Sequence, residues 1–141
     1  MKPVLTHIAL GVRDLERTIA FYRRHALLHV VHDRTEHDGT RVVWLSERPE
    51  HPTFVLVCFE AAGPAPPAPS TLQHLGFALA SREEVDAAAA AARREGVLLR
   101  EPAYAGPVVG YFCIVLDPDG NQVEFSHGQP IDPARLEAAG G

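Results

Sequence analysis

Short runs of alternating hydrophobic and polar residues recur along this 141-residue chain, and their order occurs twice. The first run, Leu5 to Leu10, precedes apolar residues spaced i, i+4, i+7 from Leu15 to Tyr22. Alternation predicts a strand, and the helical spacing predicts a helix beginning after Asp14. Three strand-like runs follow, at about 28–34, 40–46 and 53–60. The first half is therefore predicted to be strand, helix and three strands.

The second half repeats this order at an offset of 67 residues, which places Leu72-Gln73-His74-Leu75-Gly76-Phe77 over Leu5-Thr6-His7-Ile8-Ala9-Leu10. Ser81 and Glu84 have the spacing of a helix capping box, and Gly96 is a suitable helix end. Strand-like runs follow at about 97–100, 110–117 and 121–127. The last two are joined by Asp117-Pro118-Asp119-Gly120, which suits a type I turn.

A proline-rich segment, 61–71, separates the halves, and its four prolines forbid regular structure. Each half is too small to bury a comfortable core alone. We therefore predict a single α+β domain built from two paired βαβββ modules, at about 4–60 and 72–127, followed by a tail at 128–141. The modules are predicted to form a concave, partly closed mixed sheet with the helices outside. Asp132-Pro133 suits the start of one short helix in the tail.

The alternation of strand faces places three metal-ligating side chains on one side of the predicted sheet. His7 and Ala9 lie opposite the apolar set of the first strand, and His74 and Gly76 lie opposite that of its repeat. Glu124 takes the same side in the last strand. Ala9 and Gly76 are small, so they leave room beside the ligands. A histidine on a strand is most often a packing residue, but the repeat puts these two at equivalent positions.

Two imidazoles and one carboxylate bind one face of a metal ion and leave other positions for water or substrate. We therefore predict one divalent metal ion, Fe, Mn, Ni, Co or Zn, held by His7, His74 and Glu124. At an offset of 68 residues, Leu56 is the counterpart of Glu124, so three protein ligands rather than four are predicted.

Composition excludes several partners. The net charge of −5 argues against nucleic acid, and no apolar run reaches the ~18–20 residues of a membrane span. Cys58 and Cys113 lie in apolar runs, which indicates buried free thiols and a cytoplasmic protein. Strand edges need covering, which favours a homodimer.

Other residues are candidates for lining a ligand cavity, with ordinary sheet packing as the open alternative. The predicted lining residues are Phe54, Leu56, Tyr111 and Cys113. The Tyr111 hydroxyl is a weak candidate for a general acid, and no catalytic base is identified. Arg13 and Arg100 are candidates for pairing a carboxylate of a ligand, although surface arginines are common.

The pattern resembles the vicinal oxygen chelate superfamily, which includes glyoxalase I, extradiol dioxygenases, fosfomycin-resistance transferases and bleomycin-resistance proteins. The pieces that carry the resemblance are Thr6-His7-Ile8-Ala9-Leu10, His74-Leu75-Gly76-Phe77 and Asp117-Pro118-Asp119-Gly120-Asn121-Gln122-Val123-Glu124. The resemblance implies paired βαβββ modules and a metal ion at His7, His74 and Glu124. Such a metal binds vicinal oxygens of a substrate as a Lewis acid.

The chain departs from each branch of this superfamily. Glyoxalase I usually has a fourth ligand where this chain has Leu56. Extradiol dioxygenases have a tyrosine at the place of Ile114, and fosfomycin transferases have a threonine at the place of Ala9. The loop 105–110 is apolar and is unsuited to a phosphonate. Bleomycin-binding relatives lack the metal ligands.

Two kinds of function remain open at this stage. One is a metal-dependent lyase, isomerase or oxygenase that acts on a small molecule with vicinal oxygens. The other is a non-catalytic binding or sequestering protein of the same fold, which the lack of a recognisable base favours.

Overall fold

The computed structural model describes residues 5, 7–63, 74–131 and 133–138. The chain forms two compact units, Met1–Thr71 and Leu72–Gly141, which correspond to the two predicted modules. The segment predicted as a linker, 61–71, lies mostly outside the described residues.

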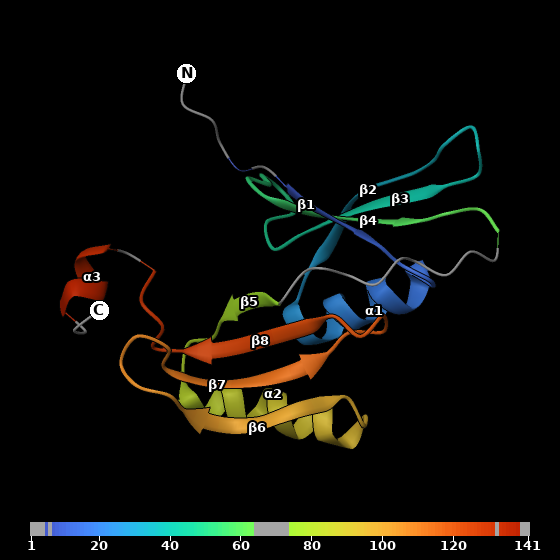
Figure 1. The fold of residues 1–141 in the computed structure, drawn as a ribbon. Helices are drawn as coiled ribbons and strands as arrows, with labels where there is room; N and C mark the ends of the chain where they lie inside the picture. Colours follow the sequence, from blue (N-terminus) through green and yellow to red (C-terminus); the bar gives the residue numbers. More distant parts are fainter. Residues whose placement is uncertain (1–4, 6, 64–73, 132, 139–141) are drawn as a thin grey trace. The chain divides into compact units, whose positions relative to one another are not determined.

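The first unit contains one helix and four strands in the order strand, helix, strand, strand, strand (Figure 1). Its elements are β1 (His7–Gly11), α1 (Leu15–Ala26), β2 (His29–Thr35), β3 (Arg41–Ser46) and β4 (Val55–Glu60). The sheet has the order β1-β4-β3-β2, in which β1 is parallel to β4 and the other pairs are antiparallel.

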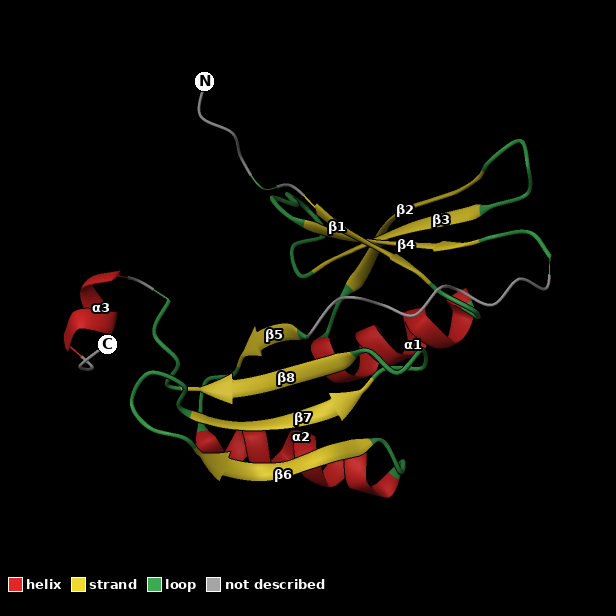
Figure 2. Ribbon diagram, in the orientation of Figure 1, coloured by secondary structure: helices red, strands yellow, loops and turns green. Residues whose placement is uncertain are grey.

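The second unit repeats this order (Figure 2). Its elements are β5 (Leu75–Ala78), α2 (Arg82–Arg94), β6 (Leu98–Tyr104), β7 (Tyr111–Leu116) and β8 (Gln122–His127), followed by the short helix α3 (Pro133–Ala138). The sheet has the equivalent order β5-β8-β7-β6, with β5 parallel to β8. The α+β class and the two βαβββ modules are confirmed. The strands pair into two four-stranded sheets, which do not close.

Both predicted helix starts are confirmed by their caps. The Asp14 carboxylate accepts a hydrogen bond from the Arg17 N–H at 3.0 Å, and the Ser81 hydroxyl accepts one from the Glu84 N–H at 3.2 Å. The Glu84 carboxylate in turn accepts from the Ala80 N–H at 2.8 Å. The bonds to Asp14 and Ser81 satisfy amide groups that the first helical turn leaves without a partner, and the bond from Ala80 fixes the chain just before the cap.

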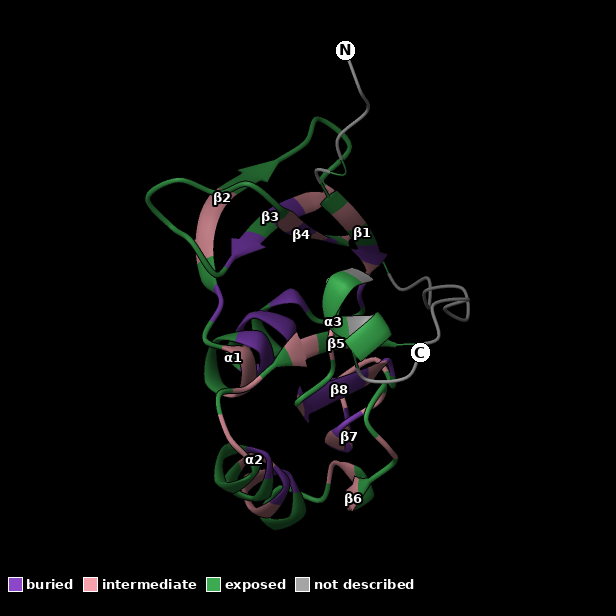
Figure 3. Cartoon of the chain, turned by 90° about the vertical axis from the view of Figure 1, so that its left-hand side faces the viewer, coloured by how far each residue is buried: buried purple, intermediate pink, exposed green. Residues whose placement is uncertain are grey.

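Helix α1 packs against one face of the first sheet. The side chains that bury this face alternate along their strands, as the period of two requires. They include Leu10, Val43, Leu45, Leu56 and Cys58, together with Leu15, Ile19 and Tyr22 of the helix. Both long helices have a buried side and an exposed side (Figure 3).

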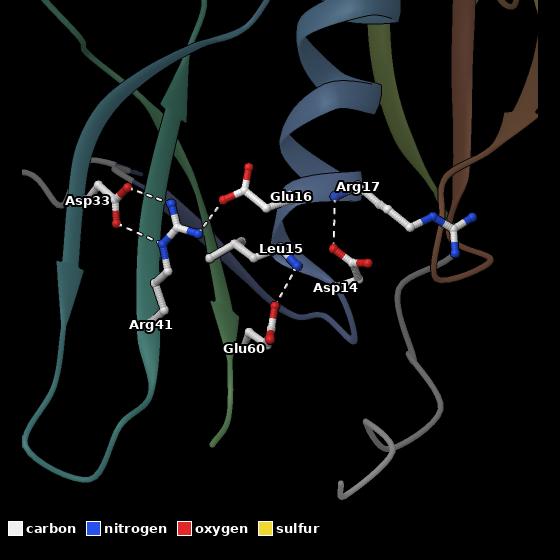
Figure 4. Close-up of polar contacts among 7 residues, drawn as sticks. All are labelled: Asp14, Leu15, Glu16, Arg17, Asp33, Arg41 and Glu60. Atoms are coloured by element: carbon white, nitrogen blue, oxygen red, sulfur yellow. Dashed lines mark hydrogen bonds and ion pairs between the residues drawn. The ribbon is translucent and has the colours of Figure 1, made fainter. Parts of the chain in front are cut away.

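An arginine on β3 ties α1 to the same face of this sheet (Figure 4). Arg41 Nη2 donates to Asp33 at 2.7 Å, and its other terminal nitrogen donates to Glu16. The Leu15 N–H donates to the Glu60 carboxylate at 2.6 Å. The guanidinium holds the pKa of Asp33 below its usual range. The opposite face of this sheet is therefore the one that carries His7.

The second sheet has its core on the face that α2 covers (Figure 1). Val85, Ala89 and Ala92 of the alanine-rich helix are fully buried, as are Val123 and Phe125 of β8. Small helix residues let α2 approach the sheet closely. Within the described residues, no helix is long and apolar enough to cross a membrane.

Candidate metal centre

The imidazole of His74 and the carboxylate of Glu124 lie together on the second sheet. His74 immediately precedes β5, and Gly76 of β5 pairs with Glu124 of the parallel strand β8. Residues two apart along an extended chain share a face, so His74 lies on the same face as Glu124. The distance from His74 Nε2 to Glu124 Oε2 is 3.9 Å. This pair was predicted from the alternation of strand faces, and the structure brings it together.

Glu124 is a buried residue whose carboxylate has few polar partners. The side chain of Glu124 is 9% exposed, whereas that of His74 is 46% exposed. Among the described residues, His74 is the partner of this carboxylate, at a distance too long for a good hydrogen bond. The carboxylate oxygens are not among the fully buried polar atoms that lack a hydrogen-bond partner, so they remain accessible to a small ion. The arrangement fits a carboxylate that binds a cation on the side of the exposed imidazole.

The backbone beside Glu124 leaves open space. A Cβ atom built on Gly76 would meet nothing within 4 Å. Any larger side chain would project beside the carboxylate, because Gly76 and Glu124 are directly paired. The glycine thus keeps the approach to the carboxylate clear.

The turn before β8 fixes the position of Glu124. One carboxylate oxygen of Asp117 accepts from the backbone N–H groups of Asp119 and Asn121, at 2.9 Å each. The other accepts from the Asn121 amide at 2.9 Å. Gly120 has a φ of +83°, which favours glycine. The predicted turn is therefore stabilised by its own buried aspartate, and it sets where β8 begins.

His7 lies in β1 of the first unit, on the face opposite α1, and is exposed. Its role as the third ligand stays a prediction, since it belongs to the other unit. Within the parts of the chain that the structure describes, no group of three His, Cys, Asp or Glu side chains is gathered closely enough to hold a metal. The chemistry of the His74–Glu124 pair fits a divalent ion, since imidazole and carboxylate both suit Fe, Mn, Co, Ni and Zn.

The family model of the glyoxalase/bleomycin resistance protein/dioxygenase superfamily matches residues 4–125. The chain belongs to this superfamily. It is 41% identical over 133 residues to the uncharacterized protein PA2024 of Pseudomonas aeruginosa, and the match covers 94% of each chain.

Solved structures show that the fold is shared across the superfamily. The trypanothione-dependent glyoxalase I of Leishmania major has a TM-score of 0.75 and 22% identity, covering 99% of this chain and 94% of its own. The fosfomycin resistance protein FosX of Listeria monocytogenes has a TM-score of 0.71 and 20% identity, and the match covers 93% of this chain and 97% of FosX. A variant of FosX in complex with Mn(II) and dihydroxypropylphosphonic acid has a TM-score of 0.66 and 22% identity, and the match covers 96% of this chain and 99% of the variant.

The strand register corrects which residue of the first sheet is the counterpart of Glu124. Ala9 pairs with Val57 in the first sheet as Gly76 pairs with Glu124 in the second. The counterpart of Glu124 is thus Val57, at an offset of 67. Leu56 pairs with Ile8, is 5% exposed and lies on the face under α1. The assignment of Leu56 to the ligand side was therefore wrong, although the residue that replaces it is also an alkyl group.

Tyr111 and Cys113 also lie on the helix side of their sheet, contrary to prediction. The Tyr111 hydroxyl donates to Asp86 Oδ1 of α2 at 2.6 Å, which raises the pKa of the phenol. The Cys113 thiol faces the carbonyl of Val85 at 3.9 Å, and burial raises its pKa to about 11. Tyr111 is therefore not a general acid on the face of Glu124.

Phe54 lies in the bend before β4 and is 37% exposed. Its assignment to the cavity depended on sharing a face with Leu56, so that reason no longer applies. Both cysteines are buried thiols that form no disulfide, as predicted.

The faces that carry Glu124 and His7 hold other residues instead. Ile114 pairs with Glu124, and Arg100 pairs with Ile114. On the first sheet Trp44 pairs with Val57, on the face of His7. Sequence reasoning missed Ile114 because it counted faces from Tyr111. Counting from Glu124 through an antiparallel hairpin would have found it.

Proposed function

We propose that this chain binds one divalent metal ion through His7, His74 and Glu124 and acts on a small molecule with vicinal oxygens, as a lyase, isomerase or oxygenase. The observation that carries the proposal is the buried carboxylate of Glu124, whose partner among the described residues is an exposed imidazole 3.9 Å away. Membership of the superfamily supports it, as does the Mn(II) bound to the FosX variant of the same fold.

The chain's own groups would hold the ion and leave one side of it accessible. Glu124 supplies a charge that the ion would neutralise, and Gly76 leaves space next to it. When bound, a divalent ion supplies Lewis-acid polarisation of substrate oxygens.

Calorimetric titration of the metal-free protein with Mn(II), Fe(II), Co(II), Ni(II) and Zn(II) tests this proposal. We expect one ion per chain, and a loss of affinity of at least about 100-fold in Glu124→Gln and in His74→Ala, because each removes a ligand. Glu83→Gln is the matched control, since Glu83 is an exposed residue of α2. Unchanged affinity in both ligand variants would show that the site is wrong. His7→Ala tests the third ligand separately.

A second function, binding without chemistry, is favoured by the position of Tyr111. Its hydroxyl donates to Asp86 of α2, so this phenol lies on the face opposite Glu124 and does not supply an acid there. A metal-loaded protein that binds a diol, catechol or thiohemiacetal tightly and converts none of them would support sequestration over catalysis.

A further inference from the structure

Arg100 shares a row of the second sheet with Glu124. The cross-strand register runs from Gly76 through Glu124 and Ile114 to Arg100, one residue on each strand. Residues paired in this way project on the same side of a sheet. Arg100 is also seated over the ring of Phe112, 4.9 Å from guanidinium to centroid. Phe112 is two residues from Ile114 and shares its face, so the ring contact confirms the direction of the arginine.

A β-bulge places Arg100 on this face. Leu98 pairs with Val115 and Arg100 pairs with Ile114, so two residues of β6 advance against one of β7. In a regular ladder Leu99 would oppose Ile114, and Arg100 would turn toward α2. Bulges interrupt the ladder and re-aim side chains, and they are frequent near functional sites. The equivalent strand of the first sheet has the same irregularity between Val30 and His32.

The guanidinium has no acidic partner within the described residues. Arg41 and Arg93 each pair with carboxylates, whereas Arg100 is exposed and contacts an aromatic ring. Arginine binds carboxylates with two parallel hydrogen bonds, and a guanidinium held over a ring keeps its edge available for them. Between this cation and Glu124 lies the apolar side chain of Ile114.

We propose that Arg100 determines substrate specificity by binding a carboxylate at the far end of the substrate. This proposal rests on the metal site proposed above. Neighbouring strands lie about 4.8 Å apart, so the Glu124 and Arg100 backbones are separated by about 10 Å. The substrate class is thus a short anion with vicinal oxygens at one end, an apolar spacer over Ile114 and a carboxylate at the other end.

Two six-carbon acids that differ only at the far end test this inference. α-Oxoadipate ends in a carboxylate, and α-oxohexanoate ends in a methyl group. Calorimetric titration of the Mn(II)-loaded wild-type protein is expected to show about tenfold tighter binding of α-oxoadipate, as a charge-assisted hydrogen-bonded pair provides. Arg100→Met is expected to reduce the ratio to about one, and Arg100→Lys to retain part of it.

Arg94→Met is the matched control, because Arg94 is an exposed arginine in the last turn of α2, which covers the other face of this sheet. It is expected to keep the tenfold preference. A preference that persists in Arg100→Met, or no preference in the metal-loaded wild type, would overturn the role of Arg100 while leaving the metal site intact. Failure of Mn(II) alone to bind would instead overturn the proposed function, and this inference with it.

Discussion

At the scale of single residues, Gly76 and Gly110 show two different uses of glycine. A Cβ on Gly76 would meet nothing, whereas a Cβ on Gly110 would lie 2.4 Å from the carbonyl oxygen of His127. Gly110 also has a φ of +80°. The first glycine leaves open space beside Glu124, and the second is required by the backbone.

We predict that Gly76→Leu changes the free energy of unfolding by no more than about 1 kcal/mol, because the site is open and strands tolerate larger residues. The same variant should weaken binding of α-oxoadipate to the metal-loaded protein at least tenfold. Gly110→Ala should cost about 2 kcal/mol or more, from the strained φ and the backbone clash. Urea unfolding measures the two changes in stability, and calorimetric titration measures the binding of α-oxoadipate. Equal destabilisation by the two substitutions would contradict this difference.

Tyr111 has a structural role that its pKa makes measurable. Its hydrogen bond to Asp86 raises the pKa of the phenol above 10, so folding favours the neutral form. This contribution to stability is complete below pH 10 and is lost as the pH rises through the raised pKa.

The unfolding midpoint of Tyr111→Phe is accordingly expected to fall less steeply than that of the wild type as the pH rises from 9 to 11. Tyr104→Phe, at a tyrosine that is 54% exposed, should follow the wild-type curve. Urea titrations at a series of pH values compare the three proteins. Parallel curves for wild type and Tyr111→Phe would show that the hydrogen bond has no part in stability.

At the scale of elements, the ends of the two long helices differ in one residue type. Leu27 follows α1 with a φ of +54°, and Gly96 follows α2 with a φ of +73°. A left-handed conformation costs a non-glycine residue roughly 1–2 kcal/mol, and glycine adopts it readily. Leu27 is 72% exposed, so its side chain contributes little packing.

Leu27→Gly is therefore expected to raise the free energy of unfolding by about 0.5–1 kcal/mol, since relief of strain exceeds the added chain entropy. The reciprocal variant Gly96→Ala should lower it by about 1 kcal/mol. Thermal and urea unfolding of both variants checks the signs. A loss of stability in Leu27→Gly would mean that the leucine packs more than its exposure indicates.

At the scale of the whole molecule, the proposed site would draw ligands from both units. Trp44 is the single tryptophan of the chain and belongs to the first unit, on the face of His7. Its fluorescence therefore reports on the unit that does not contain His74 and Glu124.

Metal at about 100 times its dissociation constant is expected to raise the free energy of unfolding by about 2.7 kcal/mol, provided that it binds the folded state alone. The free energy of unfolding followed by Trp44 fluorescence should rise by this amount in the wild type and by much less in His7→Ala. A metal-induced shift that is equally large in His7→Ala would show that His7 is not a ligand. The homodimer and the cytoplasmic location stay predictions.

Much of the fold was predictable from local pattern. Strand alternation, helical spacing, the capping residues Asp14 and Ser81 and the turn at Asp117 are local signals, and each element that they predicted is present. The repeat added what local signals lack, because it marked His74 as the equivalent of His7, and His74 is the histidine that lies near Glu124. These features follow from the order of residues along one chain, so the sequence by itself determined them.

The tertiary structure decided which face each remaining residue takes. A shift of one residue in strand register exchanges the two faces, and for this reason Val57 replaces Leu56 as the counterpart of Glu124. Tyr111 and Cys113 lie on the face opposite Glu124, because Ile114 between them pairs with Glu124, and there they contact Asp86 and Val85 of α2. Arg100 lies on the face of Glu124 because of a β-bulge, which no alternation pattern predicts. Register and bulges depend on the partner strand, so they were settled only when the strands paired.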